Sequence, residues 1–107
     1  MRVISINTNG IRAAARKGFF DWMQAQDADF VCIQETKAQA HQLEDAIFKP
    51  AGYHFYCHDA VKPGYSGTAI YSRHEPKRVT TGLGFEVADT EGRYVQLDFD
   101  DLSVASI

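Results

Sequence analysis

Apolar and polar positions alternate at the start of the chain. Around Ile4 and Ile6, isoleucine alternates with valine and serine, a pattern that predicts a short β-strand ending at Asn7. The Asn9-Gly10 pair that follows predicts a turn. The strand therefore delivers two asparagine side chains at its carboxyl end.

The next segment changes to a helical period. Residues 11–17 are rich in alanine and arginine, which are strong helix formers, and Gly18 predicts a stop or a kink. In the residues that follow, Phe19, Trp22 and Met23 stand at i, i+3 and i+4 and share one helical face. We therefore expect helical segments that pack on a sheet.

A second strand is predicted at residues 30–33, which are apolar at every position and so suit a strand buried on both faces. Strand, helix and strand in this order predict a right-handed crossover between parallel or neighbouring strands. Asn7, Asn9 and Glu35 then emerge at the same edge of the sheet. Open α/β sheets usually bind their ligands at that edge.

The remaining sequence predicts short elements. Residues 40–48 are expected to form about two helical turns before Pro50 and Gly52 end them. The last run stops at Ile107 without a cap or a polar tail, so we expect residues 1–107 to be the N-terminal part of a larger single domain. Five β-rich runs predict an antiparallel meander, at 53–60, 68–72, 78–85, 93–99 and 102–107.

Composition narrows the class of protein. With 45% hydrophobic and 23% charged residues, the chain has the composition of a soluble globular domain. Its net charge of -3 gives no general attraction to nucleic acid, so binding a polyanion requires a local basic patch or a metal. Cys32 and Cys57 lack metal-site spacing and are expected to be free thiols. No signal peptide or membrane span is evident, which predicts a cytoplasmic protein without membrane contact.

Glu35 is the candidate on which the chemistry depends. A glutamate after a buried strand is, taken alone, more often a solvated loop residue. Magnesium, however, binds through one or two carboxylates together with waters and substrate phosphates. Glu35 with the amide oxygens of Asn7 and Asn9 matches that preference.

Two further features suit a phosphate-containing ligand, and each has a simpler explanation. The segment GYSGTA at 64–69 has glycines that permit close approach of backbone to a ligand, but it also fits a plain hairpin turn. Arg12, Arg16 and Lys17, with Lys62 near them, can neutralise backbone phosphates or form a solvated helix face.

Four short sequence segments, each weak evidence alone, are informative when they are considered together. They are INTNGIR at 6–12, IQETK at 33–37, GYSG at 64–67 and EGR at 91–93. In this order and spacing they closely resemble the exonuclease III family of apurinic/apyrimidinic endonucleases, within the endonuclease/exonuclease/phosphatase superfamily, and the segment IRAAARKGFFDW strengthens the match. The resemblance covers essentially the whole chain.

The resemblance implies an α/β fold with a mixed sheet, the N-terminal portion of a four-layer αββα sandwich of the DNase I-like type. It implies Mg²⁺-dependent cleavage, with Mn²⁺ as an alternative ion, of the phosphodiester 5′ to abasic sites. It also implies 3′ to 5′ exonuclease and 3′-phosphatase activities. The expected partner is double-stranded DNA with abasic sites or 3′ ends, and the expected state is a monomer.

Site roles follow from the same resemblance. Glu35 is implied as metal ligand, Asn7 and Asn9 lie close around metal and phosphate, and Asn7 and Glu35 are the catalytic pair. Arg12 and Tyr65 are implied as contacts to the DNA backbone, and Gly64 and Ser66 shape the loop that makes them. Arg16 and Lys17 are predicted to bind DNA from their place in the cationic cluster with Arg12.

The chain also departs from the family. Ile6 stands where the family often has tryptophan, and the later tyrosine, Asp-x-Asn and Ser-Asp-His elements of the family are not within residues 1–107. We therefore expect these residues on their own to be inactive, and the intact protein to be a nuclease. Alternatives are an inositol-polyphosphate or sphingomyelin type of phosphoesterase, a non-catalytic DNA-binding fragment, or an α/β domain without a site.

Overall fold

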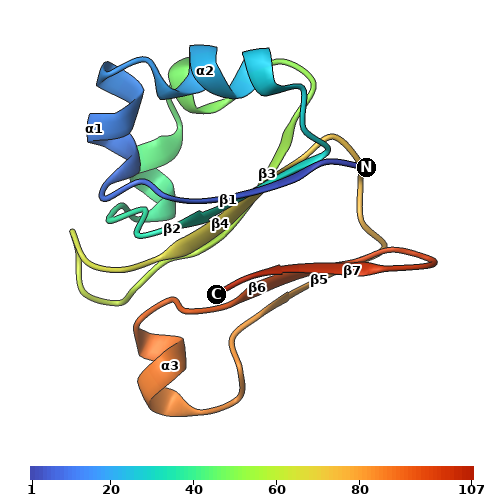
Figure 1. Ribbon diagram of the computed structural model, residues 1–107. Helices are drawn as coiled ribbons and strands as arrows, with labels where there is room; N and C mark the ends of the chain where they lie inside the picture. Colours follow the sequence, from blue (N-terminus) through green and yellow to red (C-terminus); the bar gives the residue numbers. More distant parts are fainter.

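The computed structural model describes all 107 residues, which form two β-sheets with helices on the outer face of the first (Figure 1). None of the helices combines the length and the apolar character needed to cross a membrane. In chain order the elements are β1 (Val3–Asn7), α1 (Ile11–Arg16), α2 (Phe19–Gln26), β2 (Phe30–Gln34), the 3₁₀ turns η1 (Ala40–Leu43) and η2 (Ala46–Phe48), β3 (His54–His58), β4 (Thr68–Ser72), β5 (Arg78–Thr81), α3 (Glu86–Thr90), β6 (Val95–Asp98) and β7 (Ser103–Ser106).

The strand order confirms the predicted crossover and corrects the predicted meander. The first sheet has the order β1-β2-β4-β3, with β1 and β2 parallel and Asn7 opposite Gln34. β4 pairs antiparallel with both β2 and β3, because its five residues are all buried and suit a central position. Only β5, β6 and β7 form an antiparallel meander, which is the second sheet.

The helical segments near the start match their predictions except at one residue. α1 ends at Arg16, and Gly18 lies at the N-terminus of α2 with a φ of 91°, in the left-handed region that glycine tolerates. Phe19 and Met23 are buried, but Trp22 is 42% exposed. Trp22 therefore lies outside the buried stripe that its spacing predicted.

Two later segments differ from the sequence-based expectation. Residues 40–48 form two 3₁₀ turns in place of two α-helical turns, because the Asp45 side chain accepts a hydrogen bond from Ile47 N at 3.0 Å and starts a second turn. β5 ends at Thr81, short of the predicted 78–85 run. α3 follows and lies beyond the second sheet, at one of its ends (Figure 1).

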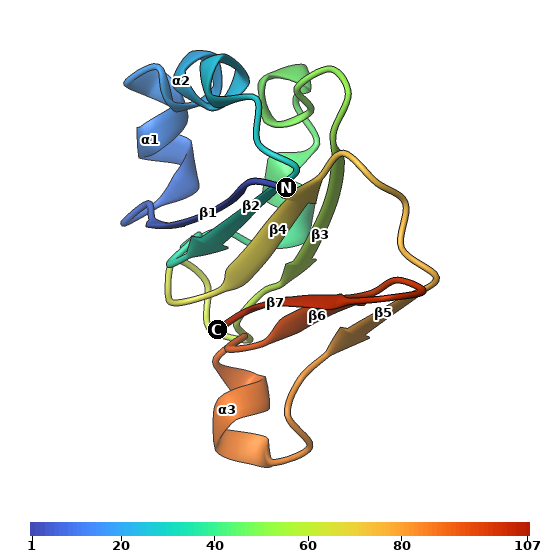
Figure 2. The same ribbon diagram turned by 45° about the vertical axis from the view of Figure 1, so that its right-hand side comes forward.

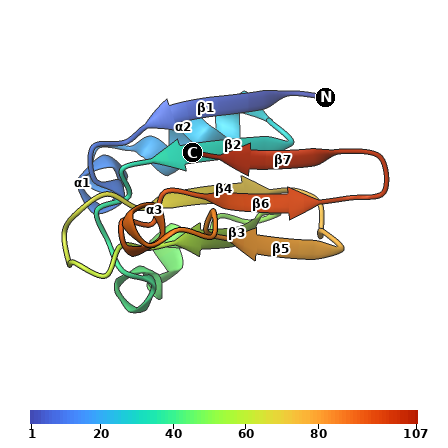
Figure 3. The ribbon, with the colours of Figure 1, turned by 90° about the horizontal axis from the view of Figure 1, so that it is seen from below.

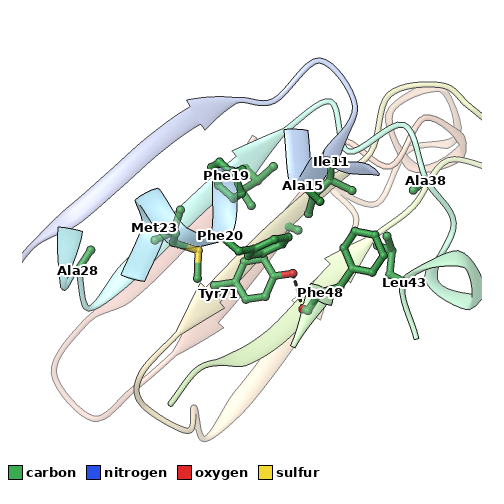
Figure 4. Packing of buried hydrophobic residues seen from close by; sticks show 13 residues of the cluster. Ile11, Ala15, Phe19, Phe20, Met23, Ala28, Ala38, Leu43, Phe48 and Tyr71 are labelled. Carbon is green, nitrogen blue, oxygen red and sulfur yellow. Dashed lines mark hydrogen bonds between the residues drawn. The ribbon is translucent and has the colours of Figure 1, made fainter. Parts of the chain in front are cut away.

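β2 separates two hydrophobic layers, as its unbroken apolar pattern predicted. Val31 and Ile33 pack against the α1 and α2 side together with Tyr71 of β4, and Figure 4 shows the aromatic centre of that layer. Phe30 and Cys32 pack on the opposite face, against residues of β6 and β7. Both cysteines are free thiols, and burial raises the pKa of each to about 11.

The two sheets lie face to face. Figure 2 shows the first sheet between the helices and the second sheet, and Figure 3 shows β7 and β6 lying beneath β2 and β4. The layer order is thus helix, sheet, sheet, with α3 beyond the second sheet. This arrangement confirms the predicted N-terminal portion of an αββα sandwich.

Candidate functional site

The loops after β1 and β2 are joined by backbone hydrogen bonds that continue past the ends of the strands. Gly10 N donates to Glu35 O at 2.8 Å, and Ile11 N donates to Thr36 O at 2.9 Å. The loop before α1 therefore lies directly beside the residues that follow β2. This contact brings Asn7, Asn9 and Glu35 to one edge of the sheet, as predicted.

A third loop, residues 64–67, is attached to the same edge. Lys37 N donates to Ser66 O at 2.7 Å, and Thr36 N donates to Gly67 O at 3.2 Å. A Cβ at Gly67 would lie 2.2 Å from Thr36 Oγ1, so only glycine permits this approach. The segment GYSG is therefore a closely packed part of the site edge as well as a turn.

Backbone strain is concentrated at these loops. Five non-glycine residues have positive φ, and four of them are Asn9 (46°), Glu35 (53°), Lys37 (50°) and Ser66 (50°). Such conformations persist only where surrounding structure holds them, and they cluster at functional sites. The strain independently marks the edge that the sequence singled out.

Glu35 is held as an accessible carboxylate. The Asn7 amide nitrogen donates a hydrogen bond to Glu35 Oε2. This bond, followed by the charge of Lys37, lowers the pKa of Glu35 below its ordinary value although burial opposes it. Asn7 Oδ1 accepts from Asn9 N at 2.9 Å, so the amide oxygen of Asn7 is turned toward its own loop and its amide nitrogen toward Glu35.

The remaining oxygens around Glu35 already face a cation. Lys37 Nζ donates to Asn9 Oδ1 at 2.5 Å and lies 3.7 Å from Glu35 Oε1. A carboxylate and an amide oxygen are hard donors of the kind that Mg²⁺ prefers. No group of three His, Cys, Asp or Glu side chains is assembled in residues 1–107. The residues present therefore fit an ion that keeps waters and binds phosphate oxygens, and they do not form an all-protein cage.

Cationic side chains lie near Glu35, but not all the predicted ones lie together. Arg12 and Arg16 line a hollow of about 420 Å³ with Lys37 and Gly64. The Arg12 guanidinium also donates to Lys37 O at 3.1 Å, which fixes it beside the site. Lys17 lines a separate hollow beside β1, with Trp22 and Asn9 among its neighbours. The helix thus separates Lys17 from the two arginines, because residues 16 and 17 point in different directions.

A second hollow, of about 370 Å³, adjoins the first and shares Lys37 and Gly64 with it. It is lined by Glu35, Lys37, Gly64, Tyr65, Ser66 and Arg93. The Lys62 ammonium lies 5.5 Å from the Tyr65 ring centre, so Lys62 is close to the site, as predicted. Lys37, Glu91 and Arg93 were assigned no role from the sequence, although QETK and EGR contain them. Their position within those two sequence segments could have indicated that they lie at the site.

Comparison with known proteins supports a common origin. A family model described as the Endonuclease/Exonuclease/phosphatase family matches residues 4–107. An exodeoxyribonuclease of Bacillus subtilis (strain 168) is 44% identical over 108 residues, covering 100% of this chain and 42% of the relative. The DNA repair nuclease APEX1 of Danio rerio is 38% identical over 103 residues, covering 94% of this chain and 33% of the relative. The chain thus spans less than half the length of these relatives.

A solved structure agrees with the sequence comparison. An AP endonuclease from Archaeoglobus fulgidus superposes with a TM-score of 0.83 at 28% identity, over 98% of this chain and 39% of that structure's chain. The agreement confirms the DNase I-like mixed α/β fold and the resemblance carried by the four sequence blocks. The chain therefore belongs to the endonuclease/exonuclease/phosphatase family.

Proposed function

We propose that the intact protein is a Mg²⁺-dependent DNA-repair nuclease that cleaves the phosphodiester 5′ to abasic sites in duplex DNA. We include 3′ to 5′ exonuclease and 3′-phosphatase activity, since all three reactions are attacks on phosphorus beside the same ion. The observation that carries the proposal is the ionised, half-exposed Glu35, which lines one of two adjoining hollows that cationic side chains also line. The proposal concerns the full-length protein, because residues 1–107 span 42% of the Bacillus relative.

The names of the relatives support a nuclease. The Bacillus relative is named an exodeoxyribonuclease, the Danio relative a DNA repair nuclease, and the Archaeoglobus structure an AP endonuclease. These names favour DNA over an inositol or lipid phosphate as the substrate. The cationic side chains that line both hollows agree, because contacts to backbone phosphates position a protein on a nucleic acid.

The residues suit distinct parts of this chemistry. A bound Mg²⁺ supplies Lewis-acid stabilisation of charge at the phosphate, and Glu35 and Asn9 are the residues that would hold it. Asn7 keeps the Glu35 carboxylate ionised and fixes its orientation through the hydrogen bond to Oε2.

The DNA backbone is positioned by residues of the two adjoining hollows. Arg12 and Arg16 offer charge in one hollow, and Tyr65 with the backbone NH groups of its loop offers donors in the other. An abasic nucleotide turns out of the helix at low cost because it has no base to unpair. Residues of both hollows can therefore contact the phosphates next to a displaced abasic sugar.

The proposal is tested on the full-length protein with a fluorescent abasic duplex in Mg²⁺. Glu35→Gln should lower the incision rate about 100-fold or more, because even outer-shell partners of a metal typically contribute 10- to 100-fold. Glu75→Gln is the matched control, since Glu75 is an exposed acid that follows β4 at its opposite end. Equal rates for Glu35→Gln and the wild type, or faster hydrolysis of an inositol polyphosphate than of the duplex, would refute it.

A further inference from the structure

Glu91 and Arg93 lie in the turn between α3 and β6, the turn that leads into the second sheet, but they reach the site built on the first sheet. They follow α3, and Arg93 lines the same hollow as Glu35 and Tyr65. We propose that Arg93 is a backbone-phosphate contact of the bound DNA and that Glu91 positions both Arg93 and Tyr65 for this contact. The inference rests on the proposed nuclease function and adds a second binding element to it.

One carboxylate holds both donors. Glu91 Oε1 accepts from Arg93 Nε at 3.0 Å, and Glu91 Oε2 accepts from the Tyr65 hydroxyl at 3.2 Å. The two side chains are thereby held by the same carboxylate although they come from different loops, one before β4 and one before β6. The bond to Glu91 uses Nε of Arg93, which leaves the two terminal nitrogens of the guanidinium for a phosphate.

The turn that carries this carboxylate is fastened to the loop that carries Tyr65. Gly67 N donates to Glu91 O at 3.3 Å, and Thr68 Oγ1 donates to Gly92 O at 3.1 Å. A Cβ at Gly92 would meet His58 O at 2.4 Å, so glycine is required for the close fit. The turn that carries Arg93 is therefore tied by hydrogen bonds to the loop that carries Tyr65.

The simpler explanation of the contact between Glu91 and Arg93 is a surface ion pair without a role in binding. The chain contains another surface ion pair that can serve as a comparison. Arg78 Nε donates to Asp98 Oδ2 at 3.2 Å at the opposite end of the second sheet, far from Tyr65. Arg93 has the same kind of partner, yet its side chain is 44% exposed and lies in the hollow beside Glu35. Exposed pairs of this kind add little to stability, so position at the site is what distinguishes Arg93.

The test measures equilibrium binding of the full-length protein to a duplex with a tetrahydrofuran abasic analogue, in EDTA, over a range of NaCl concentrations. Arg93→Gln should weaken binding and reduce the magnitude of the slope of log K against log [NaCl] by about 0.9, the loss of one phosphate contact. Arg78→Gln is the control and should leave the slope unchanged. Thermal unfolding of each variant checks that the fold is retained.

Two substitutions of Glu91 test whether this residue acts by positioning Arg93 and Tyr65 through hydrogen bonds. Both variants remove the negative charge of Glu91 beside the DNA, but Glu91→Gln keeps a side-chain oxygen that can accept from Arg93 or Tyr65, whereas Glu91→Ala has none. The Gln variant should therefore bind the duplex several-fold more tightly than the Ala variant. Equal slopes for Arg93→Gln and Arg78→Gln would overturn the phosphate contact, and equal affinities for the two Glu91 variants would overturn the positioning role. A wild-type protein that binds no duplex would overturn the proposed function together with this inference.

Discussion

The Lys37 ammonium lies 2.5 Å from Asn9 Oδ1 and is also 3.7 Å from Glu35 Oε1. The lysine thus places its positive charge between the two oxygens that fit a divalent ion. A cation bound by the same oxygens repels Lys37 and competes with it for Asn9. The hydrogen bond to Asn9 and the ion pair with Glu35 hold the ammonium at this position.

Replacing Lys37 should therefore tighten binding of a divalent ion. In the full-length protein without DNA, Lys37→Gln should raise the affinity for Mn²⁺ about 3- to 10-fold, the range expected for one partly screened charge near 4 Å. Titration followed by electron paramagnetic resonance of free Mn²⁺ measures this directly. Lys37→Arg retains the charge and should leave the affinity near that of the wild type; equal affinities for the Gln and Arg variants would contradict the competition.

Gly92 should be far less tolerant of substitution than Gly84. A Cβ at Gly92 would lie 2.4 Å from His58 O and 2.6 Å from Asp59 C, both of which are backbone atoms that cannot move aside cheaply. Gly92→Ala should lower the free energy of unfolding by about 2–4 kcal/mol, from overpacking and from positive φ together. Gly84 also has positive φ but open space around it, so Gly84→Ala should cost only about 1 kcal/mol. Urea unfolding measures both; equal losses would show that the contact with His58 is dispensable.

Tyr71 should contribute to stability through its hydroxyl. The side chain is fully buried, and its OH donates to Phe48 O at 2.7 Å, the contact drawn in Figure 4. Tyr71→Phe leaves that buried carbonyl without its donor and should lower the free energy of unfolding by about 1–3 kcal/mol. Tyr65→Phe is the matched control, because Tyr65 is 39% exposed and its hydroxyl can be replaced by water. A Tyr71→Phe variant as stable as Tyr65→Phe would contradict this role.

Local patterns predicted the part of the site that lies on neighbouring strands. The alternation around Ile6 and the apolar run at 30–33 predict two strands, and the order strand, helix, strand predicts that they are parallel or neighbouring. Asn7 and Glu35 then meet at one edge by geometry alone, without knowledge of distant residues. The structure places them in hydrogen-bond contact.

Features that depend on distant contacts were not predictable in this way. The run 68–72 fits a meander as well as the centre of the first sheet, and only burial on both faces decides between them. Glu91 and Arg93 reach Tyr65 because the two sheets pack face to face, which no local spacing encodes. The left-handed backbone at Lys37 was not predictable either, because a lysine seldom adopts it.

Asp98 should make stability depend on pH through Ser103. The Ser103 hydroxyl donates to Asp98 Oδ1 at 2.6 Å, and this bond, followed by those from Gln96 and Arg78, lowers the pKa of Asp98 below 3.8. A carboxyl whose pKa is lower in the folded than in the unfolded state stabilises the fold above its unfolded pKa. That contribution is lost as the pH falls through the folded pKa.

Ser103→Ala should therefore raise the pKa of Asp98 toward 3.8, as measured by NMR titration of its carboxyl carbon. The variant should melt at a lower temperature than the wild type at pH 7, and the difference should narrow as the pH falls below about 4, where protonation removes the advantage of the wild type. Ser103→Thr keeps the hydroxyl and should retain both the low pKa and the wild-type melting temperature. A difference in melting temperature between the Ala variant and the wild type that stays constant from pH 7 to pH 3 would assign the effect of Ser103 to packing, because only the hydrogen bond to an ionised Asp98 disappears on protonation.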